Sequence, residues 1–440
     1  MKIGRMILAA VMILLCAGGW ITQAGGMIGA RNNWQAAVAE AREYESGKLL
    51  QKAIESYERA LSIREDGEVR QEMMEACALA YQENAITRSV YKSALEKSCK
   101  LYPKTEAYWV RLVEFLRDTN SYNDAHKALG RAERAGAEGE SLAALNREIT
   151  YAFTSGAQYF SSYSAAPDGH LSICNGERWG TISSDGEREN ECDYQYVGPY
   201  SDGTVALFCT EEESRLMDGN GVLQAVVQQK VEEAKAYGDG LLPVRGNGKW
   251  SYLNPKNGTA AGSYDDVSAY QNGTAMVCAD GAWRLVDTSG NPVSEQSFSD
   301  VRLYGNGDYS PAGLISASVD GVWNLYKADG TPALKEFSAR DLDCWLGGGI
   351  AYQDESGLWG FVDKKGKTVI EPQFQEARSF SGGLAAVYDG KQWGFINEKG
   401  ALAIDYQFRD AGYFSAKGAC PVSTVDGEYH MIILRFPGGK

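Results

Sequence analysis

The chain has little histidine and little proline, with three and 11 among its 440 residues. So few imidazoles leave few candidates for acid–base relays or imidazole metal sites. Its nine cysteines include no Cys-x-x-Cys pair, which excludes zinc ribbons and thioredoxin-like redox motifs. The sequence also lacks a Gly-x-Ser-x-Gly elbow and a Gly-x-x-x-x-Gly-Lys-Ser/Thr phosphate loop. We therefore expect no cofactor, no metal and no enzymatic activity.

Basic residues are scarce in the C-terminal part of the chain. The net charge is −15, and residues 166–440 hold 23 Lys and Arg against 38 Asp and Glu. A surface of this sign repels phosphate backbones, so we expect no nucleic-acid partner. Glycine and aromatic residues are plentiful instead. The 50 Gly, 25 Tyr and 10 Trp predict many tight turns that join aromatic-rich strands.

Long hydrophobic runs are absent except at the N-terminus. Lys2 and Arg5 precede an apolar run from Met6 to Ala17, a pattern typical of an export signal. With the residues up to Ala24, the stretch is just long enough to span a bilayer. We predict that residues 1–30 form an uncleaved signal anchor, a single transmembrane helix that leaves the remainder of the chain outside the cytoplasm. The alternative is cleavage of the signal and secretion.

Residues 32–165 carry apolar side chains at helical spacing. The spacing breaks at Gly47, Gly67, Pro103 and Gly139, which predicts a series of helix pairs. A last amphipathic helix is expected from about Glu140 to Phe160, capping the series.

Two stretches of this region place small and aromatic residues where paired helices of a 34-residue repeat touch. These residues are Ala41, Tyr44, Ala53, Tyr57 and Ala60 in the first stretch, and Trp109, Leu112, Ala125, Leu129 and Ala132 in the second. The region resembles three tetratricopeptide (TPR) repeats, of which the middle one, around Tyr81 and Ala94, is weaker. The resemblance implies an α-solenoid whose concave groove binds a peptide or protein. The alternative is a generic bundle of helical hairpins.

Residues 166–440 repeat a tryptophan that is followed after seven residues by glycine. The pairs are Trp179/Gly186, Trp283/Gly290, Trp323/Gly330, Trp359/Gly366 and Trp393/Gly400. Trp250 keeps the pattern with one inserted residue, Ser214 replaces the tryptophan in the second copy, and Tyr429 begins a truncated eighth. The mean period is about 36 residues.

A two-residue turn of the Asn-Gly or Asp-Gly type precedes most of these aromatic residues, as at Asp389-Gly390. Each copy is therefore predicted to be a three-stranded meander. The segment from Leu358 to Phe374, which contains Trp359-Gly360, resembles a bacterial WG repeat, and Trp393-Gly394 begins the next copy. The resemblance covers residues 170–435 and implies an architecture more than an activity.

Seven repeats and a truncated eighth predict a propeller-like ring, because closure removes exposed strand edges. The last copy is expected to pair with the strands near Leu171 and Ile173, and an open β-array is the alternative. The fold class is thus a multidomain α+β chain: an anchor over residues 1–30, TPR-like helices over 32–165 and a WG-repeat domain over 166–440.

The repeated tryptophans are expected to fill the wedges between neighbouring meanders rather than to bind a ligand. Asp341 and Asp343, with Trp345 nearby, are the best candidates for acid–base chemistry, although turn capping explains them more simply. The three histidines, His126, His170 and His430, stand in different repeat contexts.

These observations predict a membrane-tethered, extracytoplasmic scaffold protein without enzymatic activity. The helical groove would bind a protein or peptide, and the acidic β domain would be a second recognition surface. The first alternative is a module that binds cell-envelope glycans through rim aromatics such as Trp345. The second is a glycoside-processing enzyme built on Asp341 and Asp343.

Overall fold

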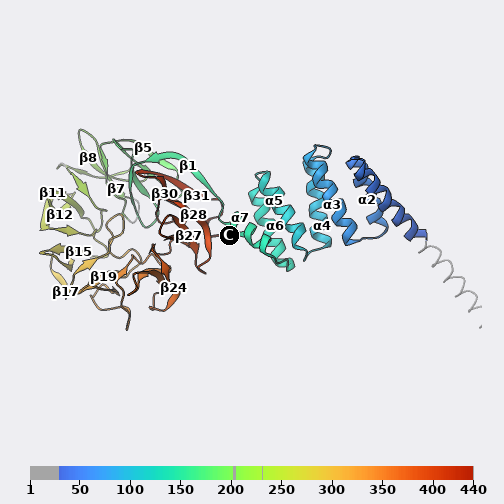
Figure 1. Ribbon diagram of the computed structural model, residues 1–440. Helices are drawn as coiled ribbons and strands as arrows, with labels where there is room; N and C mark the ends of the chain where they lie inside the picture. Colours follow the sequence, from blue (N-terminus) through green and yellow to red (C-terminus); the bar gives the residue numbers. More distant parts are fainter. Residues whose placement is uncertain (1–28, 202–204, 230, 440) are drawn as a thin grey trace, which may run out of the picture. The chain divides into compact units, whose positions relative to one another are not determined.

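The computed structural model describes residues 29–201, 205–229 and 231–439 (Figure 1). The described residues fall into two compact units that divide between Ile149 and Thr150. The predicted signal anchor, residues 1–30, lies almost wholly outside the described residues. Within the described part of the chain, no helix combines the length and the apolar character needed to cross a membrane.

The N-terminal unit consists of helices, and from the second to the sixth each packs against the next in sequence. A first helix covers residues 29–46, and it is followed by α2 (Leu50–Ile63), α3 (Gly67–Gln82), α4 (Arg88–Leu101), α5 (Glu106–Asp118), α6 (Tyr122–Ala135) and α7 (Glu140–Thr150). The Asp66 carboxylate accepts the N–H groups of Glu68 and Val69 at the start of α3, and the Thr87 hydroxyl accepts that of Val90 in α4. Gly136 ends α6 in the left-handed region at φ 72°.

The expected capping helix is shorter than predicted. Helix α7 ends at Thr150, and Phe153–Phe160 forms strand β1 instead. Residues 154–156 are Thr-Ser-Gly, which have low helix propensity, and β1 gains backbone pairing with the last strand of the chain. Strands β1 and β2 therefore lie ahead of the predicted boundary between residues 165 and 166, and they belong to the C-terminal unit.

The C-terminal unit contains eight antiparallel sheets, numbered here as blades in chain order. Blade 1 contains β2 (Ser162–Ala165), β3 (Leu171–Cys174), β4 (Trp179–Ile182) and β5 (Arg188–Tyr194). Blade 2 contains β6 (Tyr196–Val197), β7 (Val205–Cys209), β8 (Ser214–Asp218) and β9 (Leu223–Val227). Blade 3 contains β10 (Glu233–Ala234), β11 (Leu242–Gly246), β12 (Lys249–Asn254) and β13 (Thr259–Tyr264). Blade 4 contains β14 (Asp266–Val267), β15 (Thr274–Ala279), β16 (Ala282–Asp287) and β17 (Pro292–Phe298).

Blade 5 has three strands, β18 (Asp300–Val301), β19 (Ile315–Val319) and β20 (Val322–Tyr326). Blade 6 contains β21 (Asp341–Leu342), β22 (Ile350–Gln353), β23 (Trp359–Val362) and β24 (Thr368–Phe374). Blade 7 contains β25 (Glu376–Ala377), β26 (Leu384–Tyr388), β27 (Trp393–Asn397) and β28 (Leu402–Phe408). Blade 8 contains β29 (Asp410–Ala411), β30 (Ala419–Val425) and β31 (Glu428–Leu434), and its fourth strand is β1.

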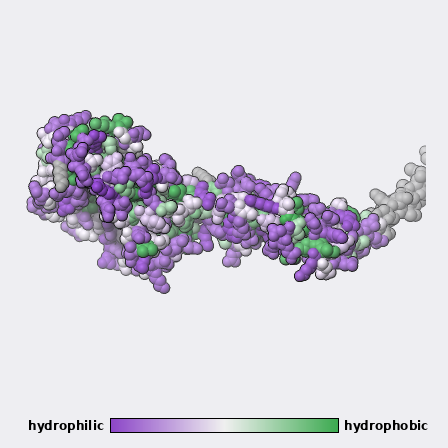
Figure 2. All heavy atoms as spheres, turned by 90° about the horizontal axis from the view of Figure 1, so that it is seen from above, coloured by the Kyte–Doolittle hydropathy of each residue, from purple (hydrophilic) through white to green (hydrophobic). Residues whose placement is uncertain are grey.

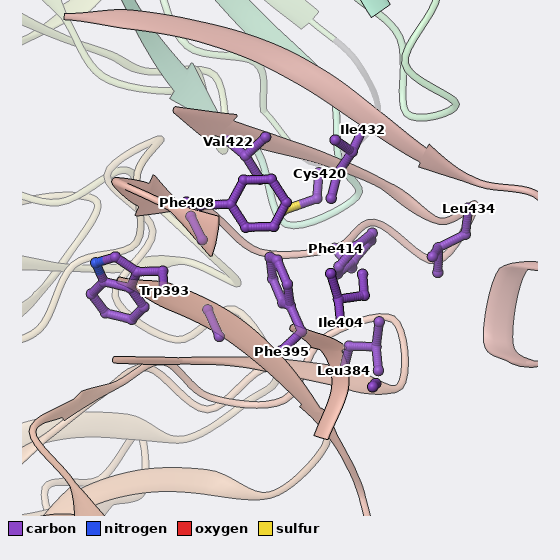
Figure 3. Packing of buried hydrophobic residues seen from close by; sticks show 13 residues of the cluster. Leu384, Trp393, Phe395, Ile404, Phe408, Phe414, Cys420, Val422, Ile432 and Leu434 are labelled. Atoms are coloured by element: carbon purple, nitrogen blue, oxygen red, sulfur yellow. The ribbon is translucent and has the colours of Figure 1, made fainter. Parts of the chain in front are cut away.

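The blades close into an eight-bladed propeller (Figure 1). A separate cluster of buried apolar residues joins each blade to the next, and one of them, which contains Phe160, Leu171 and Met431, joins blade 8 to blade 1. Figure 3 shows the cluster between blades 7 and 8, in which Phe395, Phe408 and Phe414 pack together. Closure leaves no blade with an uncovered face.

Three details of the ring differ from the predicted one. Most blades have a fourth strand of only two residues at the start of the repeat, which the predicted meander lacks. The last copy pairs with β1, in the register Phe153 to Leu434, and not with the strands near Leu171 and Ile173, which lie inside blade 1. The second copy forms a complete four-stranded blade although Ser214 replaces its tryptophan.

The glycine of the Trp-Gly pair is required by packing within a blade. A Cβ atom on Gly360 would lie 2.7 Å from the Ile370 carbonyl oxygen, and one on Gly394 would lie 2.9 Å from that of Ile404. The strand after each pair bulges at this point and presses its backbone onto the glycine.

Candidate functional site

The segment that follows the first strand of blade 5 reaches blades 1, 2 and 3. The Gly305 carbonyl accepts the Ser164 hydroxyl of blade 1 at 2.6 Å, and the Asn306 amide donates to the Tyr200 carbonyl after β6 at 3.1 Å. The Asn306 carbonyl also accepts the N–H of Ala236 in blade 3. One segment reaches several blades only at the centre of a ring, so residues 303–310 form a central plug.

Around the plug, three cations repeat one arrangement. Each follows the first strand of its own blade, lies over the repeat tryptophan of that blade and pairs with an aspartate that begins the next blade. The sets are Lys235 over Trp250 with Asp266, Arg302 over Trp323 with Asp341, and Arg378 over Trp393 with Asp410. The distances from cation to ring centroid are 4.9, 5.2 and 5.1 Å. We call these sets the cation relays, and they tie blades 3 to 4, 5 to 6 and 7 to 8.

The two candidate acid–base residues have structural partners. Asp341 receives the Arg302 guanidinium, and Asp343 accepts the Tyr413 hydroxyl at 2.9 Å and the Ser379 N–H at 2.7 Å. Asp343 is buried. Trp345 is half-buried against the cluster of blades 5 and 6, and its indole N–H donates to the Gly348 carbonyl at 3.1 Å. The arrangement supports the ring and holds these groups in place.

The repeat tryptophans all lie at the junctions between blades. Trp250, Trp283, Trp323 and Trp393 are buried, and Trp179 and Trp359 are half-buried against the neighbouring clusters. Their side chains are therefore part of the packing that joins successive blades.

The sequence reasoning missed the cation relays, although a signal for them is present. Acid–apolar–cation triplets occupy 233–235, 300–302 and 376–378, and acid–apolar triplets without a cation occupy 266–268, 341–343 and 410–412. The two kinds alternate along the chain, so blades 3 to 8 repeat in pairs. A search at twice the blade period would have found them.

His170 is the centre of a second polar cluster, on blade 1. Its Nδ1 lies 2.9 Å from the Asp168 carboxylate and its Nε2 lies 3.4 Å from that of Glu189. Tyr200 donates its hydroxyl to Glu189 at 3.3 Å. The hydrogen bond with Asp168 and then that with Glu189 raise the pKa of His170 to about 9, against the effect of burial. The imidazole is therefore charged at neutral pH.

His430 lies in the opposite environment. It is buried in β31 beside the Tyr159 ring, and burial lowers its pKa below the ordinary value. Among the described residues, no group of three or more His, Cys, Asp and Glu side chains is placed to hold a metal ion. The eight described cysteines are free thiols, seven of them buried.

In the helical unit, the predicted repeat residues lie mainly in the packing between helices. Nine of them are buried: Ala41, Ala53, Tyr57, Ala60, Trp109, Leu112, Ala125, Leu129 and Ala132. Tyr44 is half-buried. The Tyr57 hydroxyl donates to Glu45 at 2.7 Å and to Glu72 at 3.2 Å.

A ladder of ion pairs connects every second helix of this unit. Arg42, in the helix over residues 29–46, binds both oxygens of Glu72 in α3 at 2.8 and 2.7 Å. Glu75 of α3 pairs with Arg111 of α5 at 3.6 Å. Arg117 of α5 pairs with Glu148 of α7 at 3.1 Å. These contacts keep the first helices of successive pairs aligned.

One arginine of the helical unit is fully buried. The Arg70 side chain is 1% exposed, and its guanidinium binds both oxygens of Glu65 at 2.9 and 2.6 Å. Tyr102 donates its hydroxyl to the same carboxylate at 3.2 Å. The cluster fixes the turn between α2 and α3 against α4.

Comparison with known proteins identifies the repeat. Residues 359–391 and 393–429 match the family described as WG containing repeat, which confirms the predicted resemblance over these residues. No curated protein matches the chain.

Several solved structures resemble the chain at low identity. The crystal structure of BamB from Moraxella catarrhalis is 15% identical with a TM-score of 0.37, and the match covers 64% of this chain and 94% of that one. Hsv2p from Kluyveromyces lactis is 12% identical with a TM-score of 0.36, covering 54% and 92%. PorZ of Porphyromonas gingivalis, described as a surface component of the type-IX secretion system, is 9% identical with a TM-score of 0.33, covering 64% and 38%.

Proposed function

We propose that the protein is a non-enzymatic interaction scaffold, in which a TPR-like helical unit binds a protein or peptide and the WG-repeat propeller is a second recognition surface. The observation that carries the proposal is that the inner polar groups of the propeller are bound to other parts of the ring. The plug is hydrogen-bonded to blades 1 and 2, and Arg302, Arg378, Asp341 and Asp343 each bind another part of the ring. A partner would therefore bind at the outer surface of the propeller or at the helices.

The helical unit supports the first part of the proposal. Successive helix pairs leave long polar faces between the buried seams, and Figure 2 shows hydrophilic side chains over most of the visible face of each unit. The ion-pair ladder aligns the helices that would line a TPR groove. Scattered apolar side chains on this unit remain exposed, among them Leu79 at 46% and Val90 at 48%.

We further propose that the N-terminal residues hold the scaffold at the membrane, with both units outside the cytoplasm. The support is the sequence pattern of Lys2, Arg5 and the apolar run that follows them. The described cysteines are free thiols, and most of them are buried. Because burial protects a thiol from oxidation, they are compatible with a position inside or outside the cytoplasm.

Site-specific photo-crosslinking tests the scaffold function in the full chain. A photoreactive amino acid is placed at Leu79 or Val90 of the helical unit, and at Val293 or Val369 on outer strands of the propeller. All four side chains are exposed, so the substitutions leave the fold intact. We expect one recurrent protein adduct from the helical positions in the protein's own cells. Absence of protein adducts from all four positions would overturn the proposal.

A further inference from the structure

We propose that a groove between blades 1 and 2 binds an arginine-containing segment of a partner protein, an inference that rests on the scaffold function and names one partner chemistry for it. The groove has a volume of about 570 Å³. Three apolar side chains line it, Tyr194, Phe208 and Met217, together with the carboxylates of Asp193 and the run Glu211–Glu213, which we call the rim carboxylates. Arg178, Arg215 and Thr210 complete the lining. The Tyr194 and Phe208 rings meet edge to face with centroids 5.0 Å apart.

The groove lies where the repeat is most altered. In blade 2, Ser214 takes the place of the repeat tryptophan, and Thr210-Glu-Glu-Glu213 replaces the usual Asp-Gly or Asn-Gly turn. The Thr210 hydroxyl accepts the N–H groups of Glu212 and Glu213, and the Thr210 N–H donates to the Glu213 carbonyl at 2.9 Å. The altered turn is therefore an ordered one, and it places three carboxylates beside the apolar lining.

The charges of the groove are only partly neutralised. Arg178 pairs with Glu211 at 3.3 Å, and Arg215 pairs with Glu213. Asp193 and Glu212 are exposed and have no ion pair with the described residues. Two carboxylates therefore remain available to a cation from outside, in the more acidic part of the chain.

This combination of aromatic, thioether and carboxylate groups favours a guanidinium ion. A guanidinium stacks on aromatic and thioether surfaces while its planar fork binds a carboxylate, and the side-chain stem covers apolar surface. An arginine that lies on Tyr194 and Met217 would reach the rim carboxylates in this way. Lysine makes a weaker match, because a compact ammonium ion is more strongly hydrated and has no fork.

Peptide binding to the full chain tests this assignment. The probe is a fluorescent Gly-Arg-Gly-Arg-Gly-Arg-Gly peptide, with a peptide that has Ser for each Arg as its neutral counterpart, and binding is read by fluorescence anisotropy. The double variant Asp193→Asn/Glu212→Gln removes the two available carboxylates. The matched control, Glu295→Gln/Asp405→Asn, removes two exposed carboxylates from outer strands β17 and β28.

We expect the arginine peptide to bind and the serine peptide not to bind. The groove variant should weaken binding at least tenfold, and the control should change it less than twofold. Equal weakening in both variants would overturn the site, because it would show attraction to net charge alone. Equal competition by spermine at the same charge concentration would overturn the peptide assignment.

The crosslinking assay separates the groove from the scaffold function. A chain that forms adducts at Leu79 but does not bind the arginine peptide overturns the groove and leaves the scaffold function standing. Failure in both assays overturns both.

Discussion

The guanidinium of Arg378 lies 5.1 Å from the ring centroid of Trp393, and it donates at 2.8 Å to Asp410, at the start of the next blade. The repeat tryptophan thus has two roles: it is buried in the cluster between the blades, and its ring lies under a cation. Asp410 also accepts the Tyr429 hydroxyl at 2.7 Å, so removal of the arginine leaves a half-buried carboxylate without its cation.

We expect Arg378→Met to lower the free energy of unfolding by about 2 kcal/mol, since one partner of a largely buried pair is lost. The control is Arg409→Met, because Arg409 pairs with Asp426 at 3.4 Å on the surface and should contribute below about 0.5 kcal/mol. Urea unfolding followed by tryptophan fluorescence measures both. Equal effects of the two variants would contradict a structural role for the relay.

Loss of the His170 proton should make the propeller less stable at alkaline pH. Its pKa is raised to about 9 by Asp168 and Glu189, against an ordinary value of 6.5. The stabilisation is complete below pH 6.5, declines as the pH rises through the interval and is lost above pH 9, with a total of about 3 kcal/mol at most. His170→Gln should flatten this decline in urea midpoints between pH 6.5 and 9.

For His430 the dependence of stability on pH has the opposite sign, so this residue serves as an internal comparison. Burial lowers its pKa, so the unfolded chain takes up a proton first and stability falls as the pH drops below 6.5. His430→Phe should remove this acid-side loss and leave the alkaline decline in place. A single pH profile common to both variants would show that neither histidine controls it.

Glu65 should be essential to the helical unit. Glu65→Ala leaves the buried Arg70 guanidinium without its carboxylate, and we expect a loss of about 3 kcal/mol. The double variant Glu65→Ala/Arg70→Leu should recover part of this loss, because no buried charge then remains. Thermal unfolding followed at 222 nm measures the pair, and a double variant less stable than Glu65→Ala would contradict the argument.

The repeat itself was predictable because its signals are local. The spacing from Trp359 to Gly366 reflects a hairpin in which the Asp363 carboxylate accepts the N–H groups of Lys365 and Lys367, and Gly366 takes a positive φ of 80°. Residue types at fixed offsets encode such a turn. Seven repeats and a truncated eighth favoured a closed ring over an open array, and the structure has eight blades.

The contacts that hold the centre together were not predictable in this way. The two-residue first strands are too short to show an alternating pattern, and the plug at Asn306 occurs once, so no repetition marks it. Strand β1 pairs with β31 across the length of the domain, and Phe153 and Phe160 fit an amphipathic helix when they are considered without that partner.

Strand β1, which pairs with β31 and closes the ring, should mark where the propeller begins. A chain that starts at Thr150 retains β1, whereas a chain that starts at Ala166 lacks β1 and β2 and exposes the edge of β31. It also loses Phe160, which is 2% exposed in the cluster between blades 8 and 1.

We expect the longer chain to unfold in one cooperative transition. The shorter one should melt about 5 to 7 °C lower, from a loss of about 3 to 4 kcal/mol, and should associate through the free edge in gel filtration. Phe160→Ala in the longer chain separates packing from pairing, because it keeps the backbone hydrogen bonds of β1. If the two chains were equally stable and monomeric, β1 would not be the strand that closes the ring.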